Sequence, residues 1–347
     1  MEILQSLHPN LFLIFELIGF FSFIIILWRE ILQRNKMRVF EIISCAVFGM
    51  ILEIGNTYLA HTYSYSNLFL IKIFDVPLAI GLGWAVIIYC AMLLSDQYKV
   101  PWTLRPLIDA LTAIILDLSM DVIAIRLSFW HWSIPLDQEW YGVPFENLVG
   151  WIFVVLSFSY LIRFIRTLNP KRLITKIIML LSPAISYLGL IISLVVFSII
   201  VILPYQMNNW TTLLKFDYRP DFNILFNPEV QLWKLIIFII IMVELANLVI
   251  FSIKKYHKNY LIHFDVISFS ILSLLHIFFL IASFASGIYK QYPLFILLSL
   301  SGFLIHCLMH FYPYLLNPKL IYVFKEARTS IKDNKKRLNK IIDSSLR

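Results

Sequence analysis

The residues from Leu11 to Trp28 read LFLIFELIGFFSFIIILW, and they decide the class of fold. This stretch is close to the length of apolar helix that crosses a bilayer. No lysine or arginine precedes Arg29, the stretch itself carries Glu16, and no small-x-small cleavage site follows it. Because a cleavable signal peptide has the opposite features, we interpret the stretch as a first, permanent membrane span.

Eight further stretches of the chain have a similar apolar character. Of the 347 residues, 60% are hydrophobic and 14% are charged. Soluble domains carry about 25% charged residues, so this composition excludes an ordinary soluble enzyme, a disordered chain and a nucleic-acid-binding protein. We predict an all-α, polytopic bundle of about nine transmembrane helices, at 11–28, 39–60, 70–95, 106–126, 146–166, 175–203, 231–252, 263–285 and 292–314.

Lysine and arginine are distributed unevenly between the two sides of these predicted spans. With the N-terminus outside and nine alternating spans, 23 of the 29 basic residues fall on the inner side, nine of them in 316–347. Because cytoplasmic loops are rich in these residues, we predict an external N-terminus and a cytoplasmic C-terminus in the cell (plasma) membrane. We expect residues 1–315 to form one transmembrane domain. Residues 316–347 are expected to be a basic cytoplasmic tail, either solvated or lying on anionic lipid.

Polar side chains gather at one depth in the first half of the chain. An ionisable group at the centre of a span costs about 2.5–3.5 kcal/mol on insertion scales, so each needs a partner or a function. In the predicted topology, five carboxylates and two amides lie toward the outer ends of the second to fifth spans: Glu53, Asn56, Asp75, Asp117, Asp121, Glu146 and Asn147. This grouping predicts a polar site near the outer surface.

Asp117 and Asp121 are spaced i and i+4, so they share one face of a helix. Two carboxylates so close in a low-dielectric setting cannot both ionise easily, which leaves a neutral carboxylic acid available as a general acid. Two other interpretations stay open. Paired carboxylates also hold Mg²⁺ and diphosphate. The pair would be purely structural if Arg126 and nearby hydroxyl groups bound it.

The predicted outer loop at 127–145 is rich in aromatic residues: Phe129, Trp130, Trp132, Trp140 and Tyr141. These residues fit an interfacial aromatic belt, and they also suit a site that stabilises a carbocation through cation–π contact. His131 is either an interfacial residue or a proton carrier.

The second half of the chain offers fewer polar residues, namely Glu244, Asn247, His276, His306 and His310. His306 and His310 have the spacing of metal ligands but no acidic partner on their helix. We therefore favour hydrogen bonds between packed helices and predict no metal site.

Six short sequence elements follow one another along the chain in a recognisable order: GMILEIG at 49–55, YSY at 63–65, DVPLAIGLGW at 75–84, DLSMDV at 117–122, FWHW at 129–132 and YGVPFENLVGW at 141–151. In this series the chain resembles the integral-membrane carotenoid biosynthesis family that includes the carotenoid 1,2-hydratases acting on γ-carotene and bisanhydrobacterioruberin. The family-like core covers about 39–166. Val122 departs from the family pattern, which tends to have proline there, and TYLAHT at 57–62 replaces glycines.

The resemblance implies a cofactor-independent hydration of a terminal (1,2) double bond in an acyclic carotenoid end. Protonation gives a tertiary carbocation, which water captures. It implies a lipophilic carotenoid taken from the bilayer, other carotenoid pathway enzymes as partners, and no nucleic acid. We expect Asp117, Asp121 and Glu53 to be catalytic. The substrate-binding or supporting residues are expected to be Asn56, Asp75, Trp84, Trp130, His131, Trp132, Tyr141, Glu146 and Asn147.

Two other functions stay open on the sequence. A Mg²⁺-dependent membrane prenyltransferase, similar to the ubiquinone-type aromatic prenyltransferases, also has about nine spans and a DxxxD motif. That family needs a second aspartate-rich motif and a cytoplasmic site. A non-enzymatic transporter or proton-coupled channel would line a path with intramembrane carboxylates, whereas those predicted here lie at one depth.

Overall fold

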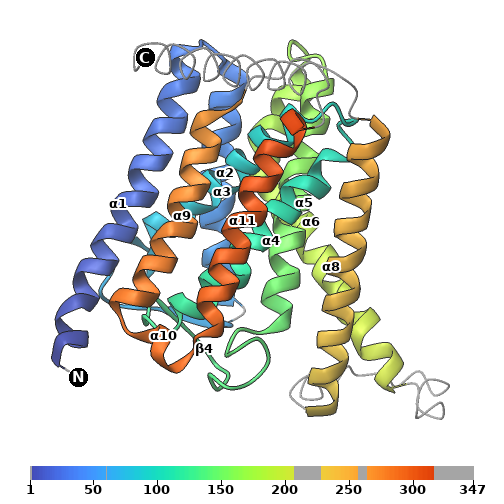
Figure 1. The fold of residues 1–347 in the computed structure, drawn as a ribbon. Helices are drawn as coiled ribbons and strands as arrows, with labels where there is room; N and C mark the ends of the chain where they lie inside the picture. The colour runs from blue at the N-terminus through green and yellow to red at the C-terminus, as the bar shows by residue number, and fades with distance from the viewer. Residues whose placement is uncertain (1, 60, 207–227, 257–263, 316–347) are drawn as a thin grey trace, which may run out of the picture.

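The computed structural model describes residues 2–59, 61–206, 228–256 and 264–315, which form a bundle of long helices (Figure 1). The long helices are α1 (Glu2–Leu32), α2 (Lys36–Ile54), α3 (Leu78–Gln97), α4 (Arg105–Ala124), α5 (Phe145–Thr167), α6 (Leu173–Gln206), α8 (Pro228–Tyr256), α9 (Val266–Ala285) and α11 (Leu294–Leu315). A short helix, α10 (Ile288–Gln291), joins the last two. Each long helix overlaps one of the stretches predicted from the sequence, which confirms a helical bundle.

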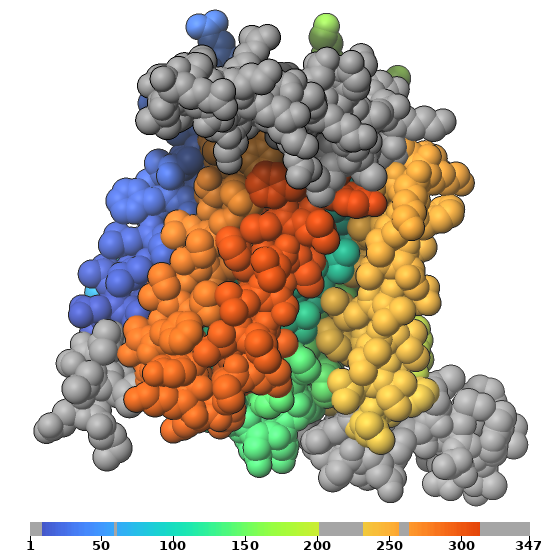
Figure 2. Space-filling model, viewed as in Figure 1, coloured from blue at the N-terminus to red at the C-terminus, as the bar shows by residue number. Residues whose placement is uncertain are grey.

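Seven of the described helices are long and apolar enough to cross a membrane, namely α1, α3, α5, α6, α8, α9 and α11. Their outer faces carry large exposed apolar side chains, such as Leu180 on α6 and Leu304 on α11. Figure 2 shows α9 and α11 side by side on one face, with α8 beside them. A soluble protein rarely exposes so much apolar surface, so these faces suit lipid.

The helices α2 and α4 have a higher proportion of charged residues than the other long helices, with four each in 19 and 20 residues. α4 lies at the centre of the bundle, where it contacts α3, α5, α8, α9 and α11. Its three aspartates, Asp109, Asp117 and Asp121, are all buried. They therefore face protein rather than lipid, which is where a membrane protein tolerates ionisable groups.

One predicted helix boundary is wrong at the end of the bundle where α1 begins. Residues 70–77 contain the hairpin of β2 (Lys72–Ile73) and β3 (Val76–Pro77), and α3 begins only at Leu78. Phe74 and Asp75 have positive φ angles of 49° and 58° at the turn, which an α-helix cannot contain. The second predicted span ends early as an α-helix, at Ile54, and continues as the π-helix η1 (Gly55–Leu59).

A two-stranded antiparallel sheet covers this end of the bundle. β1 (Tyr63–Tyr65) pairs with β4 (Trp130–Trp132), with Tyr63 opposite Trp132 and Tyr65 opposite Trp130. Because side chains alternate along a strand, these four aromatic side chains share one face of the sheet. The sequence elements YSY and FWHW are thus joined by strand pairing.

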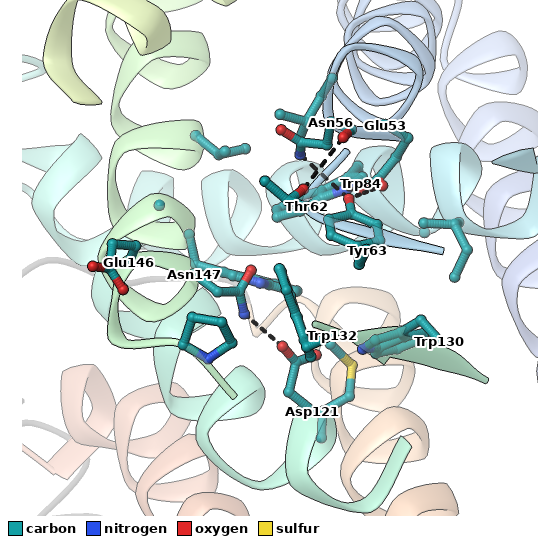
Figure 3. A pocket seen from close by; sticks show the side chains of 18 of the residues that line it. Glu53, Asn56, Thr62, Tyr63, Trp84, Asp121, Trp130, Trp132, Glu146 and Asn147 are labelled. Carbon is teal, nitrogen blue, oxygen red and sulfur yellow. Dashed lines mark hydrogen bonds between the residues drawn. The ribbon is translucent and has the colours of Figure 1, made fainter. Parts of the chain in front are cut away.

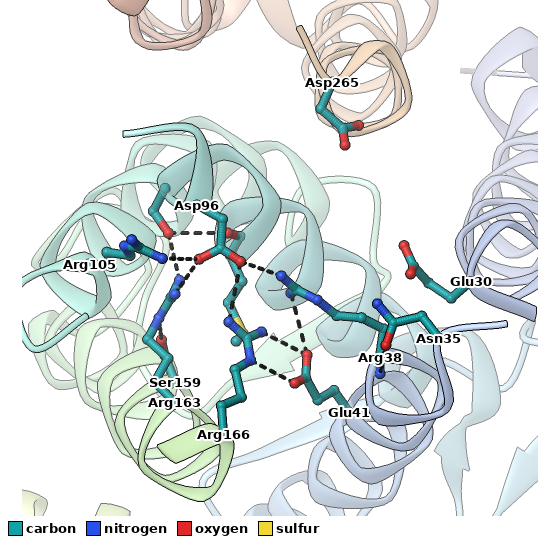
Figure 4. A network of polar contacts seen from close by, with 12 residues as sticks. Glu30, Asn35, Arg38, Glu41, Asp96, Arg105, Ser159, Arg163, Arg166 and Asp265 are labelled. Atoms are coloured by element: carbon teal, nitrogen blue, oxygen red, sulfur yellow. Dashed lines mark hydrogen bonds and ion pairs between the residues drawn. The ribbon is translucent and has the colours of Figure 1, made fainter. Parts of the chain in front are cut away.

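A network of ion pairs occupies the opposite end of the bundle (Figure 4). Four arginines bind the carboxylate of Asp96, at the end of α3: Arg38 of α2, Arg105 of α4, and Arg163 and Arg166 of α5. Glu41 accepts two hydrogen bonds of 2.7 Å from Arg166. The fully buried Asp109 pairs with Arg163 at 3.0 Å. The network therefore joins four helices through charged groups.

Candidate active site

A cavity of about 540 Å³ lies at the end of the bundle that carries the β1–β4 sheet (Figure 3). Residues from α1 to α6, from α8 and α9, and from both strands line it, and most of the lining is apolar or aromatic. Eight of the twelve predicted site residues line this cavity: Glu53, Asn56, Trp84, Asp121, Trp130, Trp132, Glu146 and Asn147. The structure thus brings together residues from α2, α3, α4, β4 and α5.

Glu53 lies in the last turn of α2, and its carboxylate accepts three hydrogen bonds. The hydroxyls of Tyr63 and Tyr65 both donate to Oε2, and Nε1 of Trp84 donates to Oε1 at 2.6 Å. The two tyrosines reach it together because they lie two residues apart on β1, on the same face. Donors directed at a carboxylate stabilise its ionised form, whereas the burial of Glu53 favours the neutral acid.

The two tyrosines remain hydrogen-bond donors at physiological pH. Burial, together with the Glu53 carboxylate, raises the pKa of both Tyr63 and Tyr65 well above its usual value. Asn56 also donates to the Tyr63 hydroxyl, at 3.3 Å. The hydrogen bonds around Glu53 therefore form one connected group.

Asp121 faces the same cavity from α4. Asn147, in the first turns of α5, donates to its Oδ2 at 2.5 Å. Asp117, one turn earlier, is fully buried and interacts electrostatically with Asp121. Within the described residues, neither oxygen of Asp117 has a well-formed hydrogen bond. Asp121 also interacts electrostatically with Glu53, and both of these carboxyl groups line the cavity.

Arg126 does not bind the aspartate pair, in contrast to one interpretation of the sequence. Its guanidinium donates to the carbonyl oxygens of Val122, Tyr141 and Leu136, at 2.9–3.1 Å. It also lies over the ring of Tyr292, 4.1 Å from the centroid. Arg126 therefore fixes the loop that precedes α5 against α4 and against Tyr292, which follows α10.

Aromatic rings form much of the cavity wall. Trp132 contacts Tyr63 with ring centroids 4.6 Å apart, and Trp84 contacts Trp151 at 4.2 Å. The indole Nε1 of Trp132 is buried, and within the described part of the chain it has no hydrogen-bond acceptor. The cavity thus offers electron-rich ring faces and, on Trp132, an N–H group that no described residue accepts.

Three charged side chains line the cavity close to the start of α5. Nζ of Lys234, on α8, lies 3.0 Å from Glu139 and 2.6 Å from Glu146. The second carboxylate oxygen of Glu139 accepts a hydrogen bond of 2.7 Å from the backbone N–H of Phe145. Burial and Glu146 raise the pKa of Glu139, whereas Lys234 opposes the rise.

Four predicted site residues lie outside the cavity lining. Asp117 is buried behind Asp121. Asp75 lies exposed in the β2–β3 turn, where it accepts a hydrogen bond from Tyr58. His131 is exposed because it lies between two inward-facing residues of β4, and Tyr141 packs on the ring of Phe295.

Several lining residues were missed by sequence reasoning. Tyr63 and Tyr65 belong to the quoted YSY element, and their alternation in a strand is the signal that would have revealed them. Lys234 lies in the apolar stretch 231–252 and is not among the predicted site residues. A lysine within an apolar stretch is itself a signal, because it needs a buried partner.

The histidines of the second half lie between α9 and α11, away from this cavity. His306 Nε2 lies 3.2 Å from the Ser273 hydroxyl, and His310 Nε2 lies 3.2 Å from the Ser268 hydroxyl. These contacts agree with the predicted hydrogen bonds between packed helices. Among the residues that the structure describes, no three histidine, cysteine or acidic side chains gather as metal ligands would.

Comparison with known proteins identifies the family. The family model described as carotenoid biosynthesis protein matches residues 12–213, which include the six elements noted in the sequence and extend to α1 and α6. No curated protein and no solved structure matches the chain significantly. The chain is a membrane protein with a role in carotenoid biosynthesis. Because the family match covers more than half of its 347 residues, it belongs to the carotenoid biosynthesis protein family.

Proposed function

We propose that this protein is a hydratase that adds water across the terminal (1,2) double bond of an acyclic carotenoid end. The observation that carries the proposal is the cavity faced by two differently held carboxyl groups. Glu53 has three hydrogen-bond donors, whereas Asp121 has one donor and the buried Asp117 beside it. Hydration needs one group that donates a proton and another that accepts one, with no change of oxidation state.

Asp121 is the proposed proton donor. Asp117 and Asp121 lie one helical turn apart and are both buried, so the pair favours holding one proton between its two carboxyl groups. Transfer of that proton to C2 of the terminal double bond uses the π electrons for the new C–H bond. It leaves a tertiary cation at C1, which the faces of Trp84, Trp130 and Trp132 can stabilise.

Glu53 is the proposed proton acceptor. A water molecule forms the C–O bond at C1 and releases one proton, which the ionised Glu53 carboxylate takes. That proton returns to the aspartate pair through solvent, so one water is consumed and no electrons leave the substrate. The free N–H of Trp132 can donate a hydrogen bond to the oxygen of the tertiary alcohol.

The shape of the cavity supports an elongated apolar substrate. Leu190, Leu194 and Phe197 of α6 line it on one side, and a volume of about 540 Å³ accommodates one end of a carotenoid rather than the whole molecule. The rest of the polyene would remain in the bilayer. In the orientation predicted from the sequence, the reacting end lies toward the outer face of the plasma membrane. The proposed partners are the pathway enzymes that supply acyclic carotenoid ends.

The proposal is tested by expressing the protein in a host that accumulates lycopene or γ-carotene. We expect a new carotenoid heavier than its precursor by one water, with a tertiary alcohol at C1. No mass change on any acyclic-ended carotenoid would overturn the hydratase assignment. Mg²⁺-dependent consumption of a prenyl diphosphate would replace it with a prenyltransferase, and carotenoid-independent solute or proton flux would replace it with a transporter.

Gly150 gives an independent test of the cavity. A Cβ atom added there meets no atom within 4 Å, whereas at Gly49 it would lie 2.7 Å from the carbonyl oxygen of Gly81. Gly150→Leu should fill the cavity and lower turnover about tenfold or more, with no loss of thermal stability. Gly49→Ala should instead destabilise the protein by overpacking. Turnover and thermal unfolding, measured on both variants, distinguish the two effects; unchanged turnover in Gly150→Leu would contradict the site.

A further inference from the structure

Lys234 is the one described residue of α8 that brings a charge into the cavity. Its side chain is only 4% exposed, although α8 is among the most apolar helices of the chain. An ammonium group inside an apolar helix is costly unless it is paired. The family match ends at residue 213, so α8 lies beyond it and contributes a group that the family comparison does not cover.

Lys234 is linked to Asp121 through the start of α5. It binds Glu139 and Glu146 at 3.0 and 2.6 Å, and Glu139 in turn accepts the N–H of Phe145 at 2.7 Å. Asn147 is the next residue after Glu146 and donates to Asp121. The ion pairs therefore hold the segment that carries the hydrogen-bond partner of the proposed acid.

The side chains of Glu139, Glu146 and Lys234 differ in their exposure to solvent. The Glu146 side chain is 35% exposed, whereas those of Glu139 and Lys234 are 2% and 4% exposed. Ser133, also in the lining, is exposed in the loop before α5. Figure 2 shows the loop before α5, coloured green, at the end of the bundle and beside α8. The charged part of the lining thus begins at the protein surface and ends in the cavity.

We propose that Glu139, Glu146 and Lys234 form a charged mouth through which water enters the cavity, separate from the apolar side lined by α6. Lys234 is the positioning residue that keeps the mouth formed and Asn147 in place. This proposal rests on the proposed hydratase function, because hydration needs a polar route for water beside an apolar route for the carotenoid. Charged, hydrogen-bonding side chains are the groups that keep such a route wet.

The route is tested without turnover by placing a cysteine at Gly150, inside the cavity, in a Cys307→Ser background. The two other cysteines, Cys45 and Cys90, are buried. The rates of modification by a cationic and an anionic water-soluble methanethiosulfonate are compared at low ionic strength, where fields in a cleft are least screened. Ser133→Cys repeats the measurement at an exposed position of the cavity lining, should the cysteine at 150 prevent folding.

The ratio of the cationic to the anionic rate should depend on the charge of the mouth. With both glutamates ionised, the mouth has a net charge of −1, which Lys234→Met makes more negative and Glu146→Gln makes neutral. We expect the ratio to rise about threefold or more in Lys234→Met and to fall in Glu146→Gln. Lys254→Met, an exposed position on the same helix, should not change it. An unchanged ratio in all variants would overturn the route.

Kinetics test Lys234 as a positioning residue. In Lys234→Met we expect the kcat for hydration to fall about tenfold while the KM for the carotenoid changes less than about twofold. Lys234→Arg should restore most of the kcat, because a guanidinium can bind both glutamates. A kcat in Lys234→Met equal to that of Lys254→Met would overturn this role. If the parent protein hydrates no carotenoid, the proposed function fails, and the labelling ratio still decides whether the mouth is the aqueous route.

Discussion

Asp121→Asn is expected to lower the kcat for carotenoid hydration by about 10²–10⁴-fold, the usual contribution of a positioned general acid. The amide has nearly the same shape as the carboxylic acid, so it still fills its place in α4. It cannot deliver a proton to the double bond, and Asp117 cannot replace it because Asp117 does not line the cavity. The loss should therefore appear in the chemical step, with little change in KM for the carotenoid.

The measurement uses membranes that contain equal amounts of folded parent and variant protein, with carotenoid products separated and quantified. Asp137→Asn is the matched control, since Asp137 is an exposed aspartate in the loop before α5. Its turnover should equal that of the parent. Turnover close to the parent in Asp121→Asn would remove this residue from the reaction. Glu53→Gln should also lose most activity, because a neutral amide cannot accept the proton released by water.

The helices of this protein follow from the sequence more directly than its site does. Apolar stretches of about twenty residues have few alternatives to a helix in a bilayer, because every backbone polar group must be bonded internally. Helical geometry then brings Glu53, Asp121 and Asn147 to one depth. That these residues share a cavity could be anticipated from the sequence. An ionisable side chain exposed to lipid has a high free energy, so such side chains face the interior of the bundle and lie near one another.

The remaining parts of the site depend on short segments that have no such constraint. A three-residue strand such as Tyr63–Tyr65 is too short for a periodicity signal, and its pairing with Trp130–Trp132 is set by tertiary contacts. The same alternation that directs Trp132 inward directs His131 outward. Asp75 leaves the predicted group because the chain reverses there in a left-handed conformation. Such a conformation is uncommon for a residue other than glycine.

Asp96→Asn is expected to lower the free energy of unfolding by about 3–5 kcal/mol, the usual effect of removing one partner from a buried ion network. In the parent the carboxylate accepts hydrogen bonds from four guanidinium groups on three helices. The side chain of Arg163 is only 1% exposed and that of Asp96 is 16% exposed, so water compensates only part of the lost charge. The asparagine keeps the shape of the side chain but leaves the arginines without their shared counter-charge.

Thermal unfolding of the purified protein in detergent measures this effect, with Asp137→Asn as a control that should match the parent. Adding Arg105→Gln to Asp96→Asn should recover part of the loss, because one uncompensated positive charge is removed. Arg105 is suited to this test because it is the most exposed of the four arginines, at 25%, and its own removal disturbs the interior least. The cost of Arg105→Gln alone is measured in the parent background. If the same substitution lowers the stability of Asp96→Asn by that full cost, the two residues act independently. The network would then be a set of separate surface pairs, each of small energy, whereas recovery shows that charge balance at Asp96 holds α2, α3, α4 and α5 together.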